Sequence, residues 1–224
     1  MIKVLNKVLS ILFIFISLIS TILYCANDIN FYNKQHTNNN ISNIIDINHN
    51  DLMDANNNLI MYLNNKRDNL NMTYNIEGIN QEFFNSKEKS HMIDVKNIYQ
   101  VFYNINIICI LLFIIILIYL IYNKDYYLIF NTYINIFKLF IIIVSIIIIL
   151  VLLDFNNFWV TLHKIFFTND LWLLNPLTDR MIIMYPLNFF YSIVIKILVI
   201  FITINGSMLS LSKIYKDKYL KGRV

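Results

Sequence analysis

The stretch His163–Phe190, HKIFFTNDLWLLNPLTDRMIIMYPLNFF, lies between two long apolar runs but is not itself a membrane span. It mixes a histidine, an Asn-Asp pair, a tryptophan, two prolines and an Asp-Arg pair with many aromatic and aliphatic residues. Such a mixture combines hydrogen-bonding groups with surface that prefers the boundary between lipid and water. We therefore expect the rest of the chain to hold this stretch against a membrane, where it would form a functional site at the boundary between lipid and water.

The apolar residues around this stretch indicate the class of protein. Of the 224 residues, 58% are hydrophobic, and they gather in long runs instead of recurring at the periods of a soluble domain. Each run is long enough to cross roughly 30 Å of hydrocarbon as a helix. The runs are Val8–Ala26 and, approximately, residues 101–122, 136–153 and 190–211. The sequence therefore predicts an all-α membrane protein with four transmembrane helices.

The first run could instead be a cleaved signal peptide, and Cys25 invites comparison with a lipoprotein signal. However, Tyr24 stands where such a signal needs a small residue before the cysteine. We therefore expect the segment to be retained as an anchor. Cys25 and Cys109 have no CxxC spacing, and we interpret both as small buried hydrophobic residues.

Residues 27–99 form a long polar segment that is expected to fold in water. Its first part, 27–50, is rich in Asn, shows no clear period and is expected to be an irregular loop. A short amphipathic helix follows, with Leu52, Ala55, Leu59 and Tyr62 at helical spacing. Residues 70–76 alternate as a strand, and Glu77-Gly78 supplies a turn before the segment 79–84. This pattern predicts a small helix-plus-β-hairpin subdomain.

The basic residues predict the orientation, because short cytoplasmic loops are enriched in Lys and Arg. They cluster at the N-terminus, in the 123–135 connection and in the tail, which places both termini in the cytoplasm. The expected order is span 1 (1–26), an extracytoplasmic subdomain (27–99), spans 2 and 3 with a short cytoplasmic connection (100–153), an extracytoplasmic loop (154–189), span 4 (190–211) and a basic cytoplasmic tail (212–224). Because these basic residues lie beside spans and not in a patch with aromatics, we do not expect nucleic-acid binding.

Two histidines fall on the same predicted side of the membrane. His91 precedes span 2 and His163 follows span 3, so their imidazoles could converge as an acid-base unit. Asp94 lies at i+3 from His91 and could orient its ring if the segment is helical. His36 and His49 lie in the Asn-rich segment and are expected to be solvated surface residues.

Other kinds of site have weaker support. A metal site built from His91, Asp94, His163 and Asp170 is an alternative, but the chain lacks a metal-binding spacing such as HExxH. We expect neither a metal nor another cofactor. The chain has no GxSxG elbow, and no serine or cysteine stands in a context that marks an activated nucleophile. An enzyme with this sequence is therefore expected to transfer a group without a protein nucleophile.

Three motifs carry a resemblance to a known family. They are His91-Met-Ile-Asp-Val-Lys96 before span 2, the segment from His163 to Pro176 after span 3, and Tyr185-Pro-Leu-Asn-Phe-Phe190. In the number and order of spans and in the placement of these motifs, the chain from about Leu52 to span 4 resembles the lipoprotein intramolecular transacylases, which are bacterial membrane enzymes. Residues 27–50 match nothing in this resemblance, and no function is assigned to them.

The resemblance implies a multi-pass acyltransferase of the bacterial cytoplasmic membrane, with its active site on the extracytoplasmic face. The implied substrates are diacylglyceryl-modified lipoproteins, in contact with membrane lipids. The enzyme would move the sn-2 acyl chain of the modified cysteine to the α-amino group of the same molecule and so give the lyso-form lipoprotein. The implied catalytic residues are His91 and His163.

Supporting roles can be suggested for residues around these histidines. We expect Asn169 to donate to the developing oxyanion and Asp94 or Asp170 to orient an imidazole. Aromatic side chains are expected to anchor the loop at the interface and to bind the substrate, namely Trp172, Tyr185 and Phe166.

A different class of function remains open at this point. The chain could be a non-enzymatic membrane accessory or binding protein that uses its outer subdomain to hold a partner.

Overall fold

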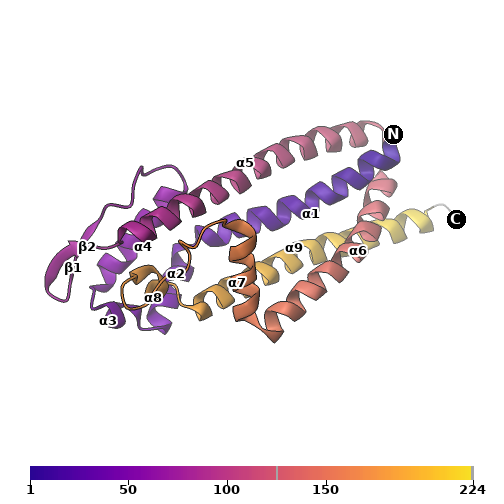
Figure 1. Ribbon diagram of the computed structural model, residues 1–224. Coiled ribbons are helices and arrows are strands. Elements are labelled where there is room, and N and C mark those ends of the chain that lie inside the picture. The colour runs from indigo at the N-terminus through magenta and orange to yellow at the C-terminus, as the bar shows by residue number, and fades with distance from the viewer. Residues whose placement is uncertain (125, 223–224) are drawn as a thin grey trace. The chain divides into compact units, whose positions relative to one another are not determined.

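The computed structural model describes residues 1–124 and 126–222 (Figure 1). Its elements, in chain order, are α1 (Ile2–Ala26), α2 (Ile29–Asn38), α3 (Ile41–Ile45), α4 (His49–Leu63), β1 (Thr73–Ile76), β2 (Ile79–Glu82), α5 (Ser86–Tyr122), α6 (Tyr126–Leu153), α7 (Phe155–Phe166), α8 (Arg180–Met184) and α9 (Leu187–Lys221). Four of these helices are long and apolar enough to cross a membrane, and the two strands form a small antiparallel sheet. The predicted fold class is therefore confirmed.

The chain divides into two compact units, and α1, α5 and α9 contribute to both. The helical unit comprises the described residues of Met1–Ile22, Phe102–Phe155 and Ile195–Val224. The mixed unit comprises Leu23–Val101 and Asn156–Val194 and contains the short helices and the hairpin. Each unit has its own hydrophobic core.

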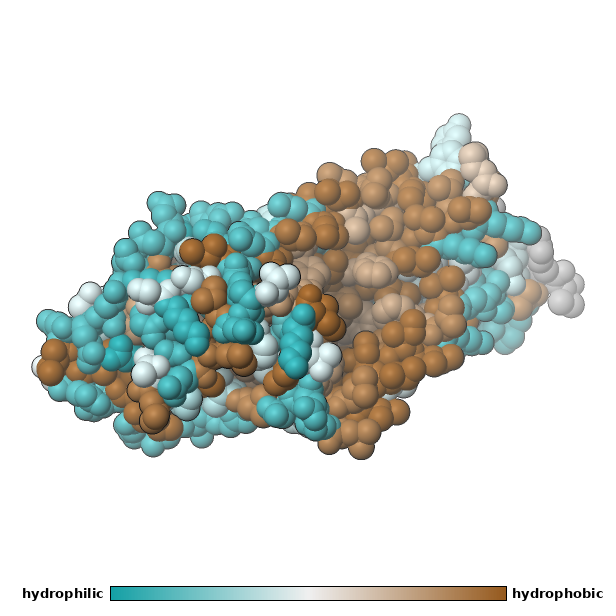
Figure 2. Space-filling model, in the orientation of Figure 1, coloured by the Kyte–Doolittle hydropathy of each residue, from teal (hydrophilic) through white to brown (hydrophobic). Residues whose placement is uncertain are grey.

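In the helical unit, α1, α5, α6 and α9 lie side by side (Figure 1). Only 11–39% of the most apolar window of each helix is buried, so most of its surface is left for lipid. Figure 2 shows these hydrophobic side chains gathered over the long helices. The small core of this unit contains Ile14, Tyr133, Phe137, Val144 and Phe201.

Polar side chains join the helices of this unit. The Tyr133 hydroxyl donates to the side-chain oxygen of Asn205 at 3.1 Å, and the Asn205 amide donates to Ser17 at 2.9 Å. The Asn106 amide donates to Ser20 at 3.0 Å. These bonds connect α6, α9 and α5 with α1, because a polar group facing hydrocarbon is costly unless it finds a partner.

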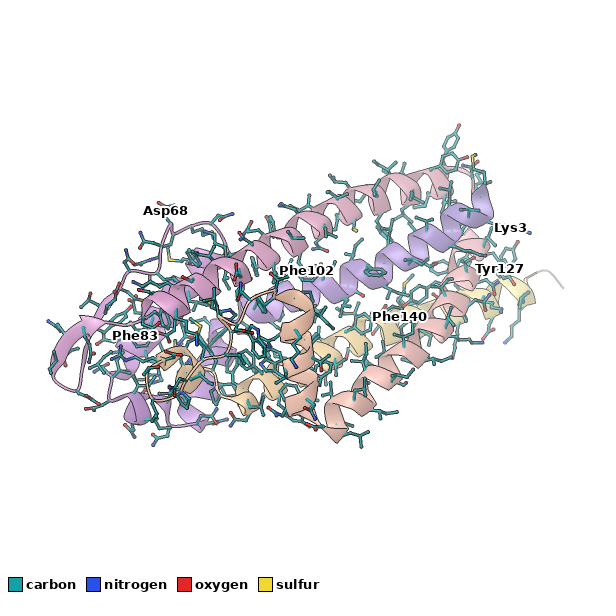
Figure 3. The ribbon with its side chains drawn as sticks, in the orientation of Figure 1. Lys3, Asp68, Phe83, Phe102, Tyr127 and Phe140 are labelled. Carbon is teal, nitrogen blue, oxygen red and sulfur yellow. The ribbon has the colours of Figure 1, made fainter. Side chains whose placement is uncertain are left out.

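The mixed unit is built around aromatic and aliphatic side chains from all its segments. Phe83 and Phe84, directly after β2, are fully buried, and Figure 3 labels Phe83 in this crowded interior. The hairpin pairs Thr73 with Glu82 and Ile76 with Ile79. Its two-residue turn, Glu77-Gly78, has positive φ at both positions (54° and 78°), which matches the twist of the flanking strands. The predicted position of the turn, at Glu77-Gly78, is therefore confirmed.

The expected irregular loop at 27–50 is wrong, because most of this segment is helical. Asp28 caps α2 by accepting from the Phe31 amide at 3.2 Å. The buried residues of α2, Tyr32 and His36, lie four positions apart, as do Ile41 and Ile45 of α3. The abundant Asn residues between them obscured this spacing.

The two histidines of this segment differ in exposure. His36 is only 1% exposed and packs against the rings of Tyr185 and Phe189, so the prediction that it is solvated is wrong. His49 is exposed, as expected, and its ring bonds Ser42 and Asn33.

All four long helices extend beyond their predicted spans, with α1 beginning at Ile2 and α6 at Tyr126. Helix α5 begins at Ser86, fifteen residues before the predicted start of its apolar run at 101. Helix α9 continues to Lys221, so most of the basic tail is helical, while residues 223–224 lie outside the described part. His91 therefore lies on the polar first turns of a helix that continues as a span.

Candidate active site

The first turns of α5 position His91. Asn85 precedes the helix, and its side-chain oxygen accepts from the Glu88 amide at 3.0 Å. The Glu88 carboxylate in turn accepts from the Asn85 amide at 2.7 Å. This reciprocal pair is a capping box, which satisfies amides that the first turn would leave unbonded. His91 follows Glu88 by three residues, so its ring is carried by a well-fixed helix start.

Helix α7 positions His163. Trp159 and His163 are four residues apart, so they share one face of the helix, and their rings lie 4.9 Å apart. The His163 Nδ1 atom lies 2.9 Å from the Trp159 carbonyl oxygen. The Phe167 amide donates to the His163 carbonyl at 2.8 Å, so the turn continues one residue past the helix end. Phe190 of α9 stacks on Trp159 at 4.2 Å and supports this face.

The two imidazoles meet within the mixed unit although 71 other residues separate them in the chain. Their ring centres lie 6.4 Å apart and their planes are 27° from parallel. Phe167 contacts both, at 5.0 Å from His91 and 5.5 Å from His163, and Trp172 lies 4.9 Å from His163. The two rings are therefore close enough to border one site.

Burial keeps both rings neutral. It lowers the pKa of His91 to about 4, with a further lowering from His163 and a smaller opposing effect of Asp94. Burial also lowers the pKa of His163, against the hydrogen bond to Trp159, which raises it. At neutral pH each ring therefore has one nitrogen able to accept a proton.

The tautomer of His163 follows from its partner. A carbonyl oxygen can only accept, so Nδ1 carries the hydrogen and Nε2 is the free base. His91 is 7% exposed, and its Nδ1 is buried without a protein hydrogen-bond partner. Asn6 and His36 also have buried side-chain atoms without a protein partner, so the position of the Nδ1 atom beside His163 is what sets His91 apart.

The loop after α7 is attached to α5 at two points. The Asn169 side-chain amide donates to Asp94 at 2.9 Å, and the Lys87 ammonium donates to the Leu173 carbonyl. Both α5 residues lie within four positions of His91. The loop therefore has a fixed position relative to the helix that carries His91.

A second set of hydrogen bonds holds α8, which follows this loop. The buried Glu88 carboxylate accepts from the Met181 amide at 2.6 Å, at the start of α8. Burial raises the pKa of Glu88, while the amides of Met181 and Asn85 oppose the rise. Arg180 donates to the carbonyl oxygens of Glu82 and Phe83. These contacts join α8, β2 and the start of α5.

Asp179 is a buried hydrogen-bond acceptor that joins the residue before α5 to the loop before α8. It accepts from the Asn85 side chain and from the Asn175 amide, both at 2.7 Å. Burial alone would raise the pKa of Asp179, but these hydrogen bonds bring it below its usual value. Asp179 therefore remains an ionised acceptor at neutral pH.

Asp94 and Asp170, which were predicted to orient an imidazole, lie in different surroundings from each other. Asp94 bonds Asn169, and among the hydrogen bonds of the described residues none joins Asp94 or Asp170 to an imidazole. Asp170 is exposed on the loop. Asp94 acts on His91 through its charge instead.

The predicted substrate-binding aromatics also differ. Trp172 contacts His163, and Phe166 is 46% exposed at the end of α7. Tyr185 is a core residue, 8% exposed, whose hydroxyl donates to Asn56 at 2.7 Å. Tyr185 thus supports the unit from inside.

Sequence reasoning missed two residues that shape the site, Trp159 and Glu88. Trp159 stands four residues before His163, a helical spacing that was readable in the sequence. Glu88 follows Asn85 by three residues, which is the pattern of a capping box. Its bond to Met181 has no sequence signal, because 93 positions separate the two residues.

The alternative of a metal site gains no support from the geometry. Within residues 1–124 and 126–222, no group of three or more His, Cys, Asp or Glu side chains is arranged to hold a metal ion.

Comparison with known proteins gives one family. The model of the family described as lipoprotein intramolecular transacylase Lit matches residues 7–190. A solved structure of the membrane-integral lipoprotein intramolecular transacylase Lit from Bacillus cereus superposes with a TM-score of 0.80 at 22% identity, covering 99% of this chain and 98% of that one. None of the curated proteins compared with the chain matches it.

Two further structures of the Bacillus cereus protein carry a substitution of one histidine, to Arg in one and to Ala in the other. Each superposes with a TM-score of 0.76 at 21% identity, covering 100% and 99% of this chain and 95% and 96% of the other, respectively. At such identities the likeness shows a shared fold.

Proposed function

The chain belongs to the lipoprotein intramolecular transacylase family and is an acyltransferase of the membrane, and on that premise we propose the reaction that it performs. It moves the sn-2 acyl chain of a diacylglyceryl-modified lipoprotein to the α-amino group of the same cysteine. Family membership also favours an enzyme over the non-enzymatic accessory protein. The observation that carries the proposal is the meeting of two neutral imidazoles, His91 and His163, in one aromatic pocket.

Holding one substrate molecule supplies much of the catalysis. The donor ester and the acceptor amine belong to the same molecule, so the enzyme only has to hold it in the reactive conformation. No acyl-enzyme is required, which agrees with the lack of any sequence mark of an activated nucleophile. In the step itself, a bond forms between the amine nitrogen and the acyl carbon, and the bond from that carbon to the sn-2 oxygen breaks.

We assign the base to His163. The α-amine has a pKa of about 7.7–8.0 in model peptides and attacks in its neutral form, after the ammonium has released one proton to water. As the carbon–nitrogen bond forms, the Nε2 atom of His163 accepts a second proton from the nitrogen, because its Nδ1 hydrogen is held by the Trp159 carbonyl. The imidazolium then gives this proton to the departing glycerol oxygen, so the step from neutral amine to amide and alcohol neither gains nor loses a proton.

His91 acts on the opposite side of the reacting group. Its ring is neutral at working pH, so one nitrogen can donate a hydrogen bond and the other can accept one. We propose that it donates to the carbonyl oxygen as negative charge develops there. Asn169 and Asp94 hold the loop beside it and keep the two rings at their separation.

We further propose that the site faces outward. The basic residues of the N-terminus, of the α5–α6 junction around Lys124 and of the tail favour a cytoplasmic location for these segments, and the mixed unit then lies outside. That is the side on which a lipoprotein is displayed by its lipid anchor. The substrate would then enter along the outer leaflet.

The test is the conversion of a synthetic diacylglyceryl-cysteine peptide by the purified protein. Mass spectrometry of the product should show the acyl chain on nitrogen and a single acyl chain left on the glycerol. We expect His163→Ala and His91→Ala to lose at least a hundredfold in rate, the lower range for a positioned acid or base. His49→Ala, which changes an exposed histidine of the same unit, should retain wild-type rate.

Folding of the variants is checked separately. In the Bacillus cereus protein, replacing one histidine by Arg or Ala leaves a chain whose structure could be solved. Circular dichroism should therefore show unchanged helix content in the variants. Full activity in both His91→Ala and His163→Ala would disprove the acid-base assignment while leaving the family intact.

A further inference from the structure

A cleft lies beside the histidine pair, within the mixed unit. Its volume is about 410 Å³, within the roughly 300–1,000 Å³ of ligand pockets. Helix α7 and the residue that follows it supply one wall with Val160, Lys164 and Phe167, which recur at i, i+4 and i+7 and so share one face. The loop after α7 supplies the facing wall, which includes Asn169, Asp170 and Trp172.

The cleft adjoins the reacting centre. Phe167 and Trp172 line it, and the same two rings contact His163 at 5.5 and 4.9 Å. His163 follows Val160 by three residues of α7, which at about 100° per residue brings it to within about 60° of Val160 around the helix axis. The helix face that borders the cleft and the face that carries His163 are therefore neighbours. A molecule reacting at His163 can therefore extend into the cleft.

The loop wall is held in place by its own bonds. The Leu171 amide donates to the Asn169 side chain at 3.1 Å, and the Leu173 amide donates to the Asp170 carbonyl at 3.1 Å. Asn169 also bonds Asp94, and the Leu173 carbonyl accepts from Lys87. The cleft is thus formed before a ligand arrives, which reduces the entropy lost on binding.

The polar groups of the cleft decide which part of the substrate fits. Lys164, Asn169 and Asp170 are exposed, and the first and last carry opposite charges. An acyl chain would remove these groups from water without offering a hydrogen bond, which is unfavourable. A peptide offers a backbone donor and acceptor at every residue, and so can satisfy them.

We propose that this cleft binds the peptide that follows the lipid-modified cysteine. The inference rests on the proposed function, because that reaction places the α-amine at His163 and requires the peptide to lead away from it. Lys164 and Asp170 then contact the side chains of the first residues after the cysteine. The cleft would make the enzyme sensitive to the charge of those residues, while the acyl chains lie elsewhere.

The first experiment compares two substrates of the wild-type protein in detergent micelles. One is a diacylglyceryl-cysteine pentapeptide, and the other is the diacylglyceryl-cysteine amide with no following residue. We expect the truncated substrate to have a KM raised severalfold with a similar kcat. Equal KM values would overturn the peptide cleft, whereas no N-acyl product from either substrate would refute the proposed function instead.

The second experiment reverses one charge. Lys164→Glu is assayed with pentapeptides carrying two Glu or two Lys after the cysteine. Exposed ion pairs contribute up to about 1 kcal/mol, so we expect the ratio of kcat/KM for acidic over basic peptide to fall by roughly fivefold. Lys34→Glu makes the same charge change at an exposed position of α2 outside the cleft lining and should leave this ratio unchanged.

Three results would overturn the inference. One is an unchanged ratio in Lys164→Glu. Another is an equal change in Lys34→Glu, which would indicate long-range charge alone. The third is an effect of Lys164→Glu that follows acyl-chain length and not peptide charge, because the cleft would then hold a lipid chain.

Discussion

His91 and His163 differ in what their ring nitrogens contact. His163 has one nitrogen fixed by the Trp159 carbonyl, whereas the buried Nδ1 of His91 has no protein partner. The carbonyl bond fixes the tautomer of His163 before substrate arrives. Buried polar atoms without a partner are uncommon, and the proposed reaction gives the Nδ1 atom of His91 a partner in the substrate.

The pKa shifts predict the pH dependence of the reaction. Both imidazoles have lowered pKa values, so both are already neutral near pH 7, and the substrate amine is the group that limits the rate there. We expect log kcat/KM to rise with unit slope toward about pH 8, where the amine is deprotonated, and then to level off. The measurement is initial rate against pH with one lipopeptide.

The acid side of the same profile reports the enzyme. Below the lowered pKa of His163 the slope should steepen, because the base is then protonated as well as the amine. A fall in rate above pH 8 would contradict this assignment, since it would mean that the reaction needs a protonated group whose pKa lies above the lowered values of the two imidazoles.

At the scale of elements, one carboxylate joins two segments of the site. Glu88 caps α5 through the Asn85 amide and reaches the first turn of α8 through the Met181 amide. Asp179 and Arg180 connect the same segments from the other side. The position of His91 relative to the loop that carries Asn169 therefore depends on side chains that do not contact the imidazoles.

Replacing Glu88 by Ala tests this connection. The change leaves two backbone amides without their acceptor, and each buried unsatisfied donor costs about 1–3 kcal/mol. We expect the free energy of unfolding to fall by about 2 kcal/mol or more, measured by chemical denaturation in detergent.

Glu82→Ala is the matched control. Glu82 is half exposed and pairs with Lys89 at the surface, where an ion pair contributes about 0–1 kcal/mol. If the two variants lose the same stability, the buried carboxylate has no special role in joining α5 to α8.

At the scale of the whole molecule, membrane insertion follows from the four long helices and their apolar surface. In the helical unit, the hydrogen bonds of Asn205 with Tyr133 and Ser17 show how α1, α6 and α9 pair polar side chains with one another. Orientation depends on a different property, the placement of Lys and Arg along the chain.

Cysteine labelling in intact cells tests the proposed orientation. Asp68, on the loop after α4 (Figure 3), and Asp217, near the end of α9, are both exposed and suit a single introduced cysteine. A membrane-impermeant maleimide should label Asp68→Cys in intact cells and Asp217→Cys only after lysis, because the proposed orientation keeps the basic tail inside. The reverse pattern would place the histidine pair in the cytoplasm.

Some parts of the fold and site could be predicted because their signals are local. The spans, the Glu77-Gly78 turn and the helix after residue 50 each follow from residues within one element. The helices of residues 29–45 were missed because Asn dominates their composition, although Tyr32 and His36 keep helical spacing. His36 was misjudged for a different reason, because its burial depends on Tyr185 and Phe189 of a distant segment.

The sequence by itself determined that the chain is a four-helix membrane protein and that His91 and His163 are its candidate acid-base residues, since hydrophobic length and residue chemistry are properties of the chain. Only the tertiary structure decided that the two rings lie 6.4 Å apart, that Trp159 fixes the tautomer of His163, and that Glu88 joins α5 to α8. The distances between these segments are set by packing in the mixed unit, where side chains far apart in sequence must share one core. No local pattern encodes that packing.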